Sequence, residues 1–155
     1  MIRFYIAVLL GILLVGGVSA QEVVVVDGLG GSFRRNMQVE VDRLRNQGYD
    51  VTYRPWWQWR SAARSASQGS RVIGYSMGGP RAIKVAQRAN ASQLELVDPV
   101  SIRPMQAPAA VDTTVFRAAQ EGRINSTAVH GNYSQQWIPT DHVGMPSLFL
   151  SLIHF

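Results

Sequence analysis

Hydrophobic and polar positions along this chain follow two alternating patterns. Short runs of valine, isoleucine and leucine between turn residues are typical of strands buried on both faces of a parallel sheet. The clearest is the run of four valines at 23–26, which turn residues follow. The other predicted strands are 50–55, 70–76, 93–99 and 126–133.

Longer segments with helical spacing separate these strands. In the first, 32–47, Met37, Val41 and Leu44 fall on one stripe, and Gly48 is a natural stop. The remaining predicted helices are 56–69, 77–90, 113–122 and 146–155. This alternation predicts an α/β fold with a mostly parallel sheet of about five strands and helices on both faces.

Two segments stand outside the alternation. Residues 99–114 contain three prolines and predict an irregular excursion over the sheet edge. Residues 1–20 combine Arg3, an apolar run and small residues ending at Ala20, which predicts a secretory signal. The apolar run is shorter than the ~20 residues that span a bilayer, which favours cleavage over a membrane anchor. We therefore expect residues 21–155 to form a single domain.

The amino-acid composition limits the cellular compartment and the classes of partner that we expect. The chain has no cysteine, so packing holds the exported fold without disulfides, which favours a bacterial periplasm or exterior. The net charge is +5, and Lys84 is the only lysine. No dense basic run or nucleic-acid module occurs, so we expect no nucleic-acid partner, and we find no sign of an obligate protein partner. No metal-ligand spacing is present, and we expect no metal or cofactor.

The segment GYSMGG, residues 74–79, carries the candidate chemistry. It lies between a predicted strand and a predicted helix, where a tight turn brings backbone segments close together. Gly74 and Gly78 relieve that crowding, and the turn projects the hydroxyl of Ser76 from the carboxyl end of the sheet. The free amides at the start of the helix point to the same space and can stabilise negative charge. Ser76 is therefore a candidate nucleophile.

At this point the sequence resembles the α/β-hydrolase fold, specifically the small bacterial lipases and esterases, over most of residues 21–155. The segment DGLGG, residues 27–31, is similar to the family's His-Gly-x-Gly segment, with Asp27 in place of histidine. The resemblance implies an oxyanion hole formed by the backbone amides of Leu29 and Met77. The departure at Asp27 leaves those donors possible and puts the shape of the loop in question.

A candidate acid follows the fourth predicted strand. Asp98 stands in the sequence VDP, and a carboxylate at the carboxyl end of a strand can orient a catalytic histidine. Most members of the family place the acid one strand later, but some lipases have it here in a similar Asp-Pro context. Asp112 and Asp141 are the alternative acids.

The candidate base is one of three histidines. His142 lies in TDHVGMP, in a polar loop before the last predicted helix, and the segment resembles the Asp-His-x-x-x-Pro endings of small lipases and cutinase-like enzymes. His130 is the alternative. The resulting order of Ser76, Asp98 and His142 is that of the α/β-hydrolases.

The predicted function is therefore a secreted serine hydrolase that cleaves carboxylic esters through an acyl-enzyme. Trp56, Trp57 and Trp59 follow the second strand and could form an apolar wall for an acyl chain, contact a lipid interface, or pack in the core. We expect Trp56, Trp57 and Tyr75 to contact a small-molecule or lipid ester. The alternatives are a catalytically inactive binding protein, or a thioesterase or amidase on the same fold.

Overall fold

A computed structural model of the protein describes residues 20–29, 31–120 and 126–146. The predicted signal segment, residues 1–19, and all but the first residue of the predicted last helix lie outside the described residues. In the part described, no helix is long and apolar enough to cross a membrane.

Six strands form one sheet in which every pairing is parallel. Their order across the sheet is β2 (Asp50–Pro55), β1 (Glu22–Asp27), β3 (Arg71–Tyr75), β4 (Gln93–Val97), β6 (Asp112–Ala118) and β8 (Ser134–Ile138). The predicted parallel α/β fold is confirmed, with six strands in this sheet rather than about five. The chain builds outward in opposite directions from β1, so β1 and β3 flank the point where the strand order reverses. Ligands of open α/β sheets bind at such a point, outside the carboxyl ends of the strands.

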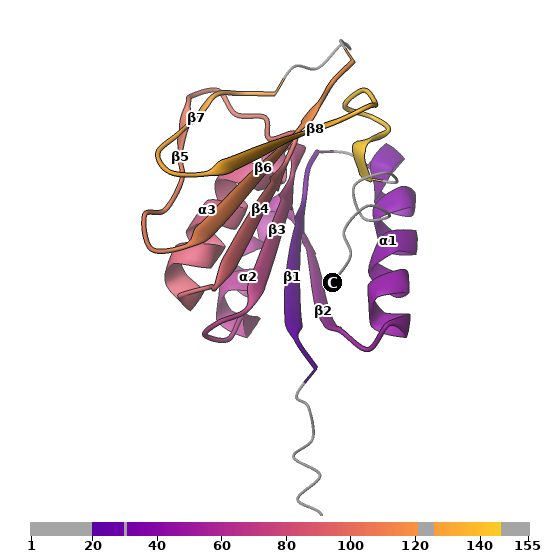
Figure 1. The fold of residues 1–155 in the computed structure, drawn as a ribbon. Coiled ribbons are helices and arrows are strands. Elements are labelled where there is room, and N and C mark those ends of the chain that lie inside the picture. The colour runs from indigo at the N-terminus through magenta and orange to yellow at the C-terminus, as the bar shows by residue number, and fades with distance from the viewer. Residues whose placement is uncertain (1–19, 30, 121–125, 147–155) are drawn as a thin grey trace, which may run out of the picture.

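Helices cover both faces of the sheet, as Figure 1 shows. The helix α1 (Gly31–Asn46) packs on one face, where Met37, Val41 and Leu44 meet alternate residues of the central strands. The helices α2 (Trp59–Ser65) and α3 (Gly79–Ala89) pack on the other face. Short 3₁₀ turns, η1 (Trp56–Gln58) and η2 (Ser76–Gly78), precede α2 and α3.

The last two connections between parallel strands contain no helix among the described residues. Each carries a two-residue strand instead, β5 (Met105–Gln106) and β7 (Val129–His130), and these pair with each other as a separate small sheet. Met105 and Val129 are buried in the same core as α2 and α3. Of the excursion predicted for residues 99–114, residues 99–111 leave the main sheet and contribute to its core, whereas residues 112–114 already belong to β6.

Three sequence predictions for the part of the chain after β4 are wrong. The helix predicted at 113–122 does not form over its described residues, 113–120, because the β-branched and aromatic run TTVF belongs to the buried strand β6. Of the strand predicted at 126–133, only β7 forms, and it lies outside the main sheet. The last strand among the described residues, β8, lies in the region predicted as a polar loop. Its sequence SQQWI shows no apolar alternation because it is an edge strand whose first four residues are exposed.

Candidate active site

The turn after β3 has the geometry of a strained nucleophile loop. All five residues of β3 are buried, and the chain enters η2 directly at Ser76. Ser76 has a φ of 52°, in the left-handed region that residues other than glycine seldom adopt. Two glycines allow this crowding, because a Cβ on Gly78 would lie 2.1 Å from the carbonyl oxygen of Val26, and one on Gly74 would lie 2.4 Å from the Cβ of Ala82.

The structure brings Ser76, His142 and Asp98 together in one chain of hydrogen bonds. The Nε2 atom of His142 lies 3.0 Å from the hydroxyl oxygen of Ser76, and its Nδ1 atom lies 2.5 Å from Oδ2 of Asp98. An ionised carboxylate only accepts hydrogen bonds, so Nδ1 carries the proton and Nε2 is free to accept one from Ser76. All three side chains are buried, with exposures of 8 %, 2 % and 2 % for Ser76, His142 and Asp98.

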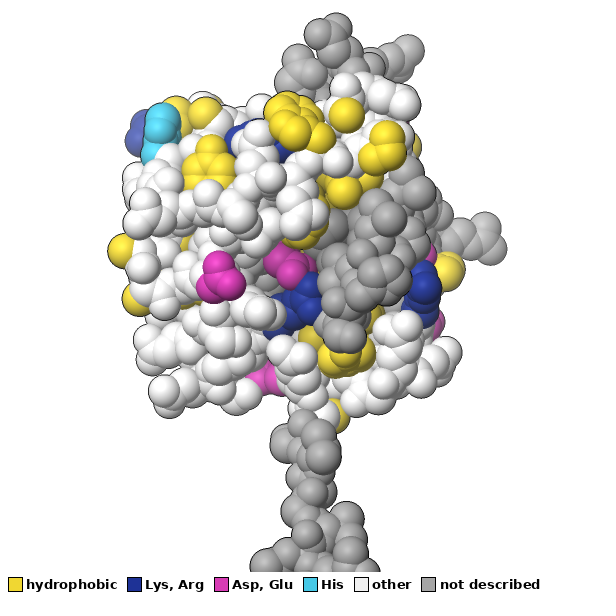
Figure 2. Space-filling model, in the orientation of Figure 1, with side chains coloured by type: hydrophobic (Ala, Val, Ile, Leu, Met, Phe, Trp, Pro, Cys, Tyr) yellow, Lys and Arg dark blue, Asp and Glu magenta, His cyan; other side chains and the backbone are white. Residues whose placement is uncertain are grey.

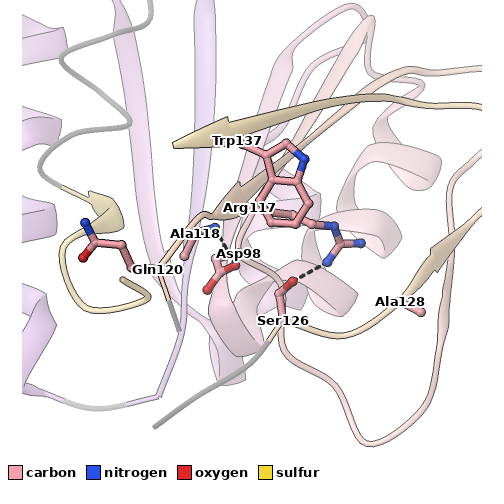
Figure 3. Close-up of a pocket in the computed structure, with 7 residues that line it drawn as sticks. All are labelled: Asp98, Arg117, Ala118, Gln120, Ser126, Ala128 and Trp137. Atoms are coloured by element: carbon pink, nitrogen blue, oxygen red, sulfur yellow. Dashed lines mark hydrogen bonds between the residues drawn. The ribbon is translucent and has the colours of Figure 1, made fainter. Parts of the chain in front are cut away.

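Asp98 is held by the strand next to its own. Its backbone N–H donates to the carbonyl of Phe116 at 2.7 Å, and its Oδ1 accepts from the amide of Ala118 at 3.1 Å. Figure 3 shows Asp98 beside Ala118, at the wall of a cavity of about 430 Å³. Neither Ser76 nor His142 lines that cavity. Like Ser76, Asp98 has a positive φ, of 41°.

Tyr75 supports the histidine. Its hydroxyl donates to the backbone carbonyl of His142 at 2.7 Å, and the two rings stack with centroids 5.2 Å apart. The sequence analysis predicted that Tyr75 contacts the substrate. The structure instead buries Tyr75, which is 1 % exposed, against His142. Burial raises the pKa of Tyr75, and the negative charges of Asp27, Asp98 and Asp141 raise it further. The phenol therefore stays protonated and keeps donating to His142.

The loop after β1 meets the nucleophile turn. A Cβ on Gly28 would lie 2.8 Å from the Cβ and 3.3 Å from the Oγ of Ser76, so this loop passes directly beside the hydroxyl. Asp27 is buried, and its carboxylate accepts from the amide of Gly28 at 2.7 Å and from the hydroxyl of Tyr53 at 2.5 Å. These contacts order the chain where it turns toward Leu29. No sequence signal pointed to Tyr53 as the partner of Asp27.

The two amides implied for the oxyanion hole lie on this loop and on η2. Met77 is the second residue of η2, and the first N–H groups of a helix have no acceptor within that helix. Leu29 follows Gly28, whose backbone passes beside Ser76. The two segments adjoin at the point where the strand order reverses.

The alternative acids and base lie in other surroundings. Asp112 is exposed at the first residue of β6, at the opposite end of the sheet from the loop of Asp98. Asp141 accepts from the amide of Gly144 at 2.9 Å and shapes the loop of His142. His130 is exposed in β7. Within the described ranges, no group of three metal-ligating side chains could hold a metal ion.

The three tryptophans after β2 have different surroundings. Trp59 is buried in the core between α2 and α3. Trp57 is 59 % exposed and meets Trp56 edge to face, with ring centroids 6.1 Å apart. Trp56 is half-buried and lines a cavity together with Met77.

Fold and site together define a parallel α/β protein with a Ser–His–Asp hydrogen-bond chain at the carboxyl edge of its sheet. No protein-family model matches the sequence, and no curated protein is significantly similar to it. Among solved structures, the fold is similar to that of a "putative hydrolase of the alpha/beta superfamily" from Xanthomonas campestris pv. campestris. The identity is 15 %, the TM-score is 0.49, and the match covers 85 % of this chain and 97 % of that one.

Proposed function

We propose that this protein is a secreted serine hydrolase that cleaves carboxylic esters through a covalent acyl-enzyme. One observation carries the proposal: the continuous hydrogen-bond chain from the Ser76 hydroxyl through His142 to Asp98, beside a loop and a helix start that present backbone amides. Nucleophile, base and orienting acid in this relation are the parts that acyl transfer needs.

In the proposed reaction, Nε2 of His142 takes the proton of Ser76 as Oγ attacks the carbonyl carbon of the ester. The amides of Leu29 and Met77 stabilise the resulting oxyanion, and losing one such donor typically costs ~10²–10³ in rate. His142 then protonates the departing alcohol, which leaves an acyl group on Ser76. A water molecule that loses its proton to His142 attacks this acyl group and releases the acid.

The surface around the site supports a lipid-interface role for the same enzyme. Six large hydrophobic side chains are strongly exposed among the described residues, and five of them lie at or just beyond the carboxyl ends of strands: Leu29, Trp57, Ile102, Trp137 and Val143. In Figure 2, exposed hydrophobic side chains gather toward the upper edge, where the strands of Figure 1 end. Apolar groups clustered at one edge suit contact with a lipid surface.

A fluorophosphonate probe tests the proposal directly. Purified protein starting at Gln21 should be labelled covalently, and the labelling should vanish in Ser76→Ala and survive in Ser65→Ala, whose serine lies on α2 away from the triad. A panel of 4-nitrophenyl esters from two to twelve carbons, with matched thioesters and amides, then gives the acyl preference and the bond type. Folded wild-type protein that neither reacts with the probe nor turns over any ester would contradict the proposal.

One observation favours a second candidate, a binding protein without turnover. The buried carboxylate of Asp27 stands where the related lipases carry histidine, at the entry to the loop of Leu29. A negative charge there opposes the charge that develops on an oxyanion. Ester binding by calorimetry, with no probe labelling of the folded protein, identifies this alternative.

A further inference from the structure

A groove of about 590 Å³ begins beside the nucleophile turn. It starts at Met77, which is adjacent to Ser76, and continues along α3. One wall is the face of α3 that carries Arg81 and Lys84, and the other is the loop of residues 100–103 that follows Asp98. Its full lining is Trp56, Met77, Pro80, Arg81, Lys84, Val100, Ser101, Ile102 and Arg103.

The charge of this groove is of one sign. Three of its lining residues, Arg81, Lys84 and Arg103, are cationic, and none is acidic. None of these three cations forms an ion pair with an acidic side chain among the described residues. The sequence from residue 51 to residue 94 contains no aspartate or glutamate at all, so α2 and α3 bring no compensating charge.

Both walls are held in place by neighbouring parts of the protein. The guanidinium of Arg81 lies 5.7 Å from the ring centroid of Trp56, within the range of a cation–π contact. The opposite wall is pinned at Ser101, whose N–H donates to Oγ1 of Thr127 at 2.8 Å and whose carbonyl accepts from that hydroxyl at 2.9 Å. Arg81 on one wall and the backbone of Ser101 on the other are therefore held by contacts within the protein.

We propose that this groove binds a negatively charged group of the ester substrate, a carboxylate or phosphate several atoms from the scissile carbonyl. The inference rests on the proposed function, since it assigns the substrate class of the same site. Arginine and lysine bind such anions through charge-assisted hydrogen bonds, while Met77, Val100 and Ile102 accommodate the apolar atoms between the anion and the reacting carbonyl. The enzyme thus prefers anionic esters to neutral esters of the same size.

Two matched substrate pairs test the preference and locate the charge. In one pair the acyl part carries it: the 4-nitrophenyl monoester of adipic acid against the same compound with its free carboxylate methylated. In the other the alcohol carries it: the butyrate ester of propanediol monophosphate against its dimethyl-capped form, followed by acid release. We expect a higher kcat/KM for the anionic member of at least one pair. The pair that shows the preference identifies which side of the ester the groove holds.

Variants tie the preference to the groove. Arg81→Gln and Arg103→Gln should each lower the anionic-to-neutral ratio of kcat/KM by about tenfold, the value of one hydrogen bond to a charged group. Arg88→Gln is the matched control, because Arg88 lies on α3 and over the Trp59 ring, as Arg81 does, but does not line the groove. The ratio should persist in Arg88→Gln. Equal kcat/KM for both members of both pairs, or an equal loss in Arg88→Gln, would overturn the assignment.

A binding measurement separates this inference from the proposed function. In Ser76→Ala the esters stay intact, so calorimetry reports their affinity directly. Tighter binding of the anionic member without turnover by the wild type keeps the groove and rejects the hydrolase. Turnover of both members at equal kcat/KM, with equal affinities in Ser76→Ala, keeps the hydrolase and rejects the anion groove.

Discussion

Two buried polar clusters involve the neighbouring strands β3 and β4, and they differ in how their charged and polar groups are paired. One joins the loops after β3 and β4 to His142, in the loop after β8, and the other lies within the two strands. Beyond the carboxyl ends, Asp98, His142 and Ser76 form a chain in which each side chain has a hydrogen-bond partner. Nearer the amino ends, Arg71 pairs with Glu95 within the sheet, and Oε2 of Glu95 has no hydrogen-bond partner among the described residues. Burial raises the pKa of Glu95, the Arg71 cation opposes the rise, and Asp112 adds to it.

The two clusters also differ in backbone conformation. Ser76 and Asp98 both have positive φ angles, whereas Arg71 and Glu95 have regular strand conformation. Strained backbone is concentrated at functional sites, and Ser76 combines it with a hydroxyl beside a base, an arrangement suited to nucleophilic attack. A salt bridge inside a sheet serves stability at most. The comparison predicts that changes beyond the carboxyl ends abolish activity, while changes at the pair alter unfolding.

The largest expected effect is that of Ser76→Ala on turnover. Removing the nucleophile of a serine hydrolase lowers kcat by about 10⁶. The fold should persist, because alanine keeps the Cβ of Ser76 and removes only the hydroxyl that contacts Nε2 of His142. Ester hydrolysis and far-UV circular dichroism measure both outcomes. Substantial turnover by the folded variant would contradict the assignment of Ser76 as the nucleophile.

The next effect is that of Asp98→Asn, which should lower kcat by about 10⁴. An amide in place of the carboxylate can donate to Nδ1 of His142, which moves the histidine proton to Nε2. Nε2 can then no longer accept the proton of Ser76. Asp112→Asn and Asp141→Asn are the controls and should retain most activity. If Asp112→Asn were the damaging change, the acid would be wrongly assigned.

Changes to the Arg71–Glu95 pair should alter the stability of the fold rather than its activity. Glu95→Ala leaves the Arg71 charge buried without its carboxylate and should lower the free energy of unfolding by about 3–5 kcal/mol. Replacing both residues by methionine and leucine should be neutral or stabilising. Urea unfolding measures each change, and ester hydrolysis should match the wild type in both. A loss of activity at full stability would remove the distinction between the two clusters.

Gly78→Ala tests the close packing that positions the nucleophile. The added Cβ would meet the backbone carbonyl of Val26, which cannot turn away as a side chain could. Overpacking of this kind costs about 1–3 kcal/mol. It should also slow fluorophosphonate labelling. Gly48→Ala is a useful contrast, since alanine would be strained at the φ of +93° but its Cβ would meet nothing, so stability should fall without a change in labelling.

The smallest effect concerns Tyr75 at high pH. Because the pKa of Tyr75 is raised in the folded protein, the unfolded chain loses this proton first, and stability should fall as pH rises above about 10. Tyr75→Phe should show a shallower alkaline decline, and it should cost about 1 kcal/mol at neutral pH by losing the bond to His142. Denaturant midpoints between neutral and alkaline pH measure both. A parallel decline in the two proteins would contradict the role given to Tyr75.

The first half of the fold was predictable because its signals are local. The valines of β1, the apolar stripe of α1 and the capping Gly48 each occur within one element. The second half was not, because β8 takes its conformation from the neighbouring strand β6, whose own β-branched run TTVF lies in the segment predicted as a helix. The sequence SQQWI becomes a strand only because β6 offers it a free edge.

The sequence alone determined the tight turn that carries Ser76, since the spacing of Gly74, Ser76 and Gly78 between a buried strand and a helix specifies a local conformation. The sequence also identified candidates for the acid and the base, because aspartate and histidine residues occur in its predicted loops. Only the tertiary structure decided that Asp98 and not Asp112 meets His142, that Tyr75 lies beneath that ring, and that cations from α3 and a distant loop share one groove. Those contacts join residues dozens of positions apart, and strand order and packing bring them together.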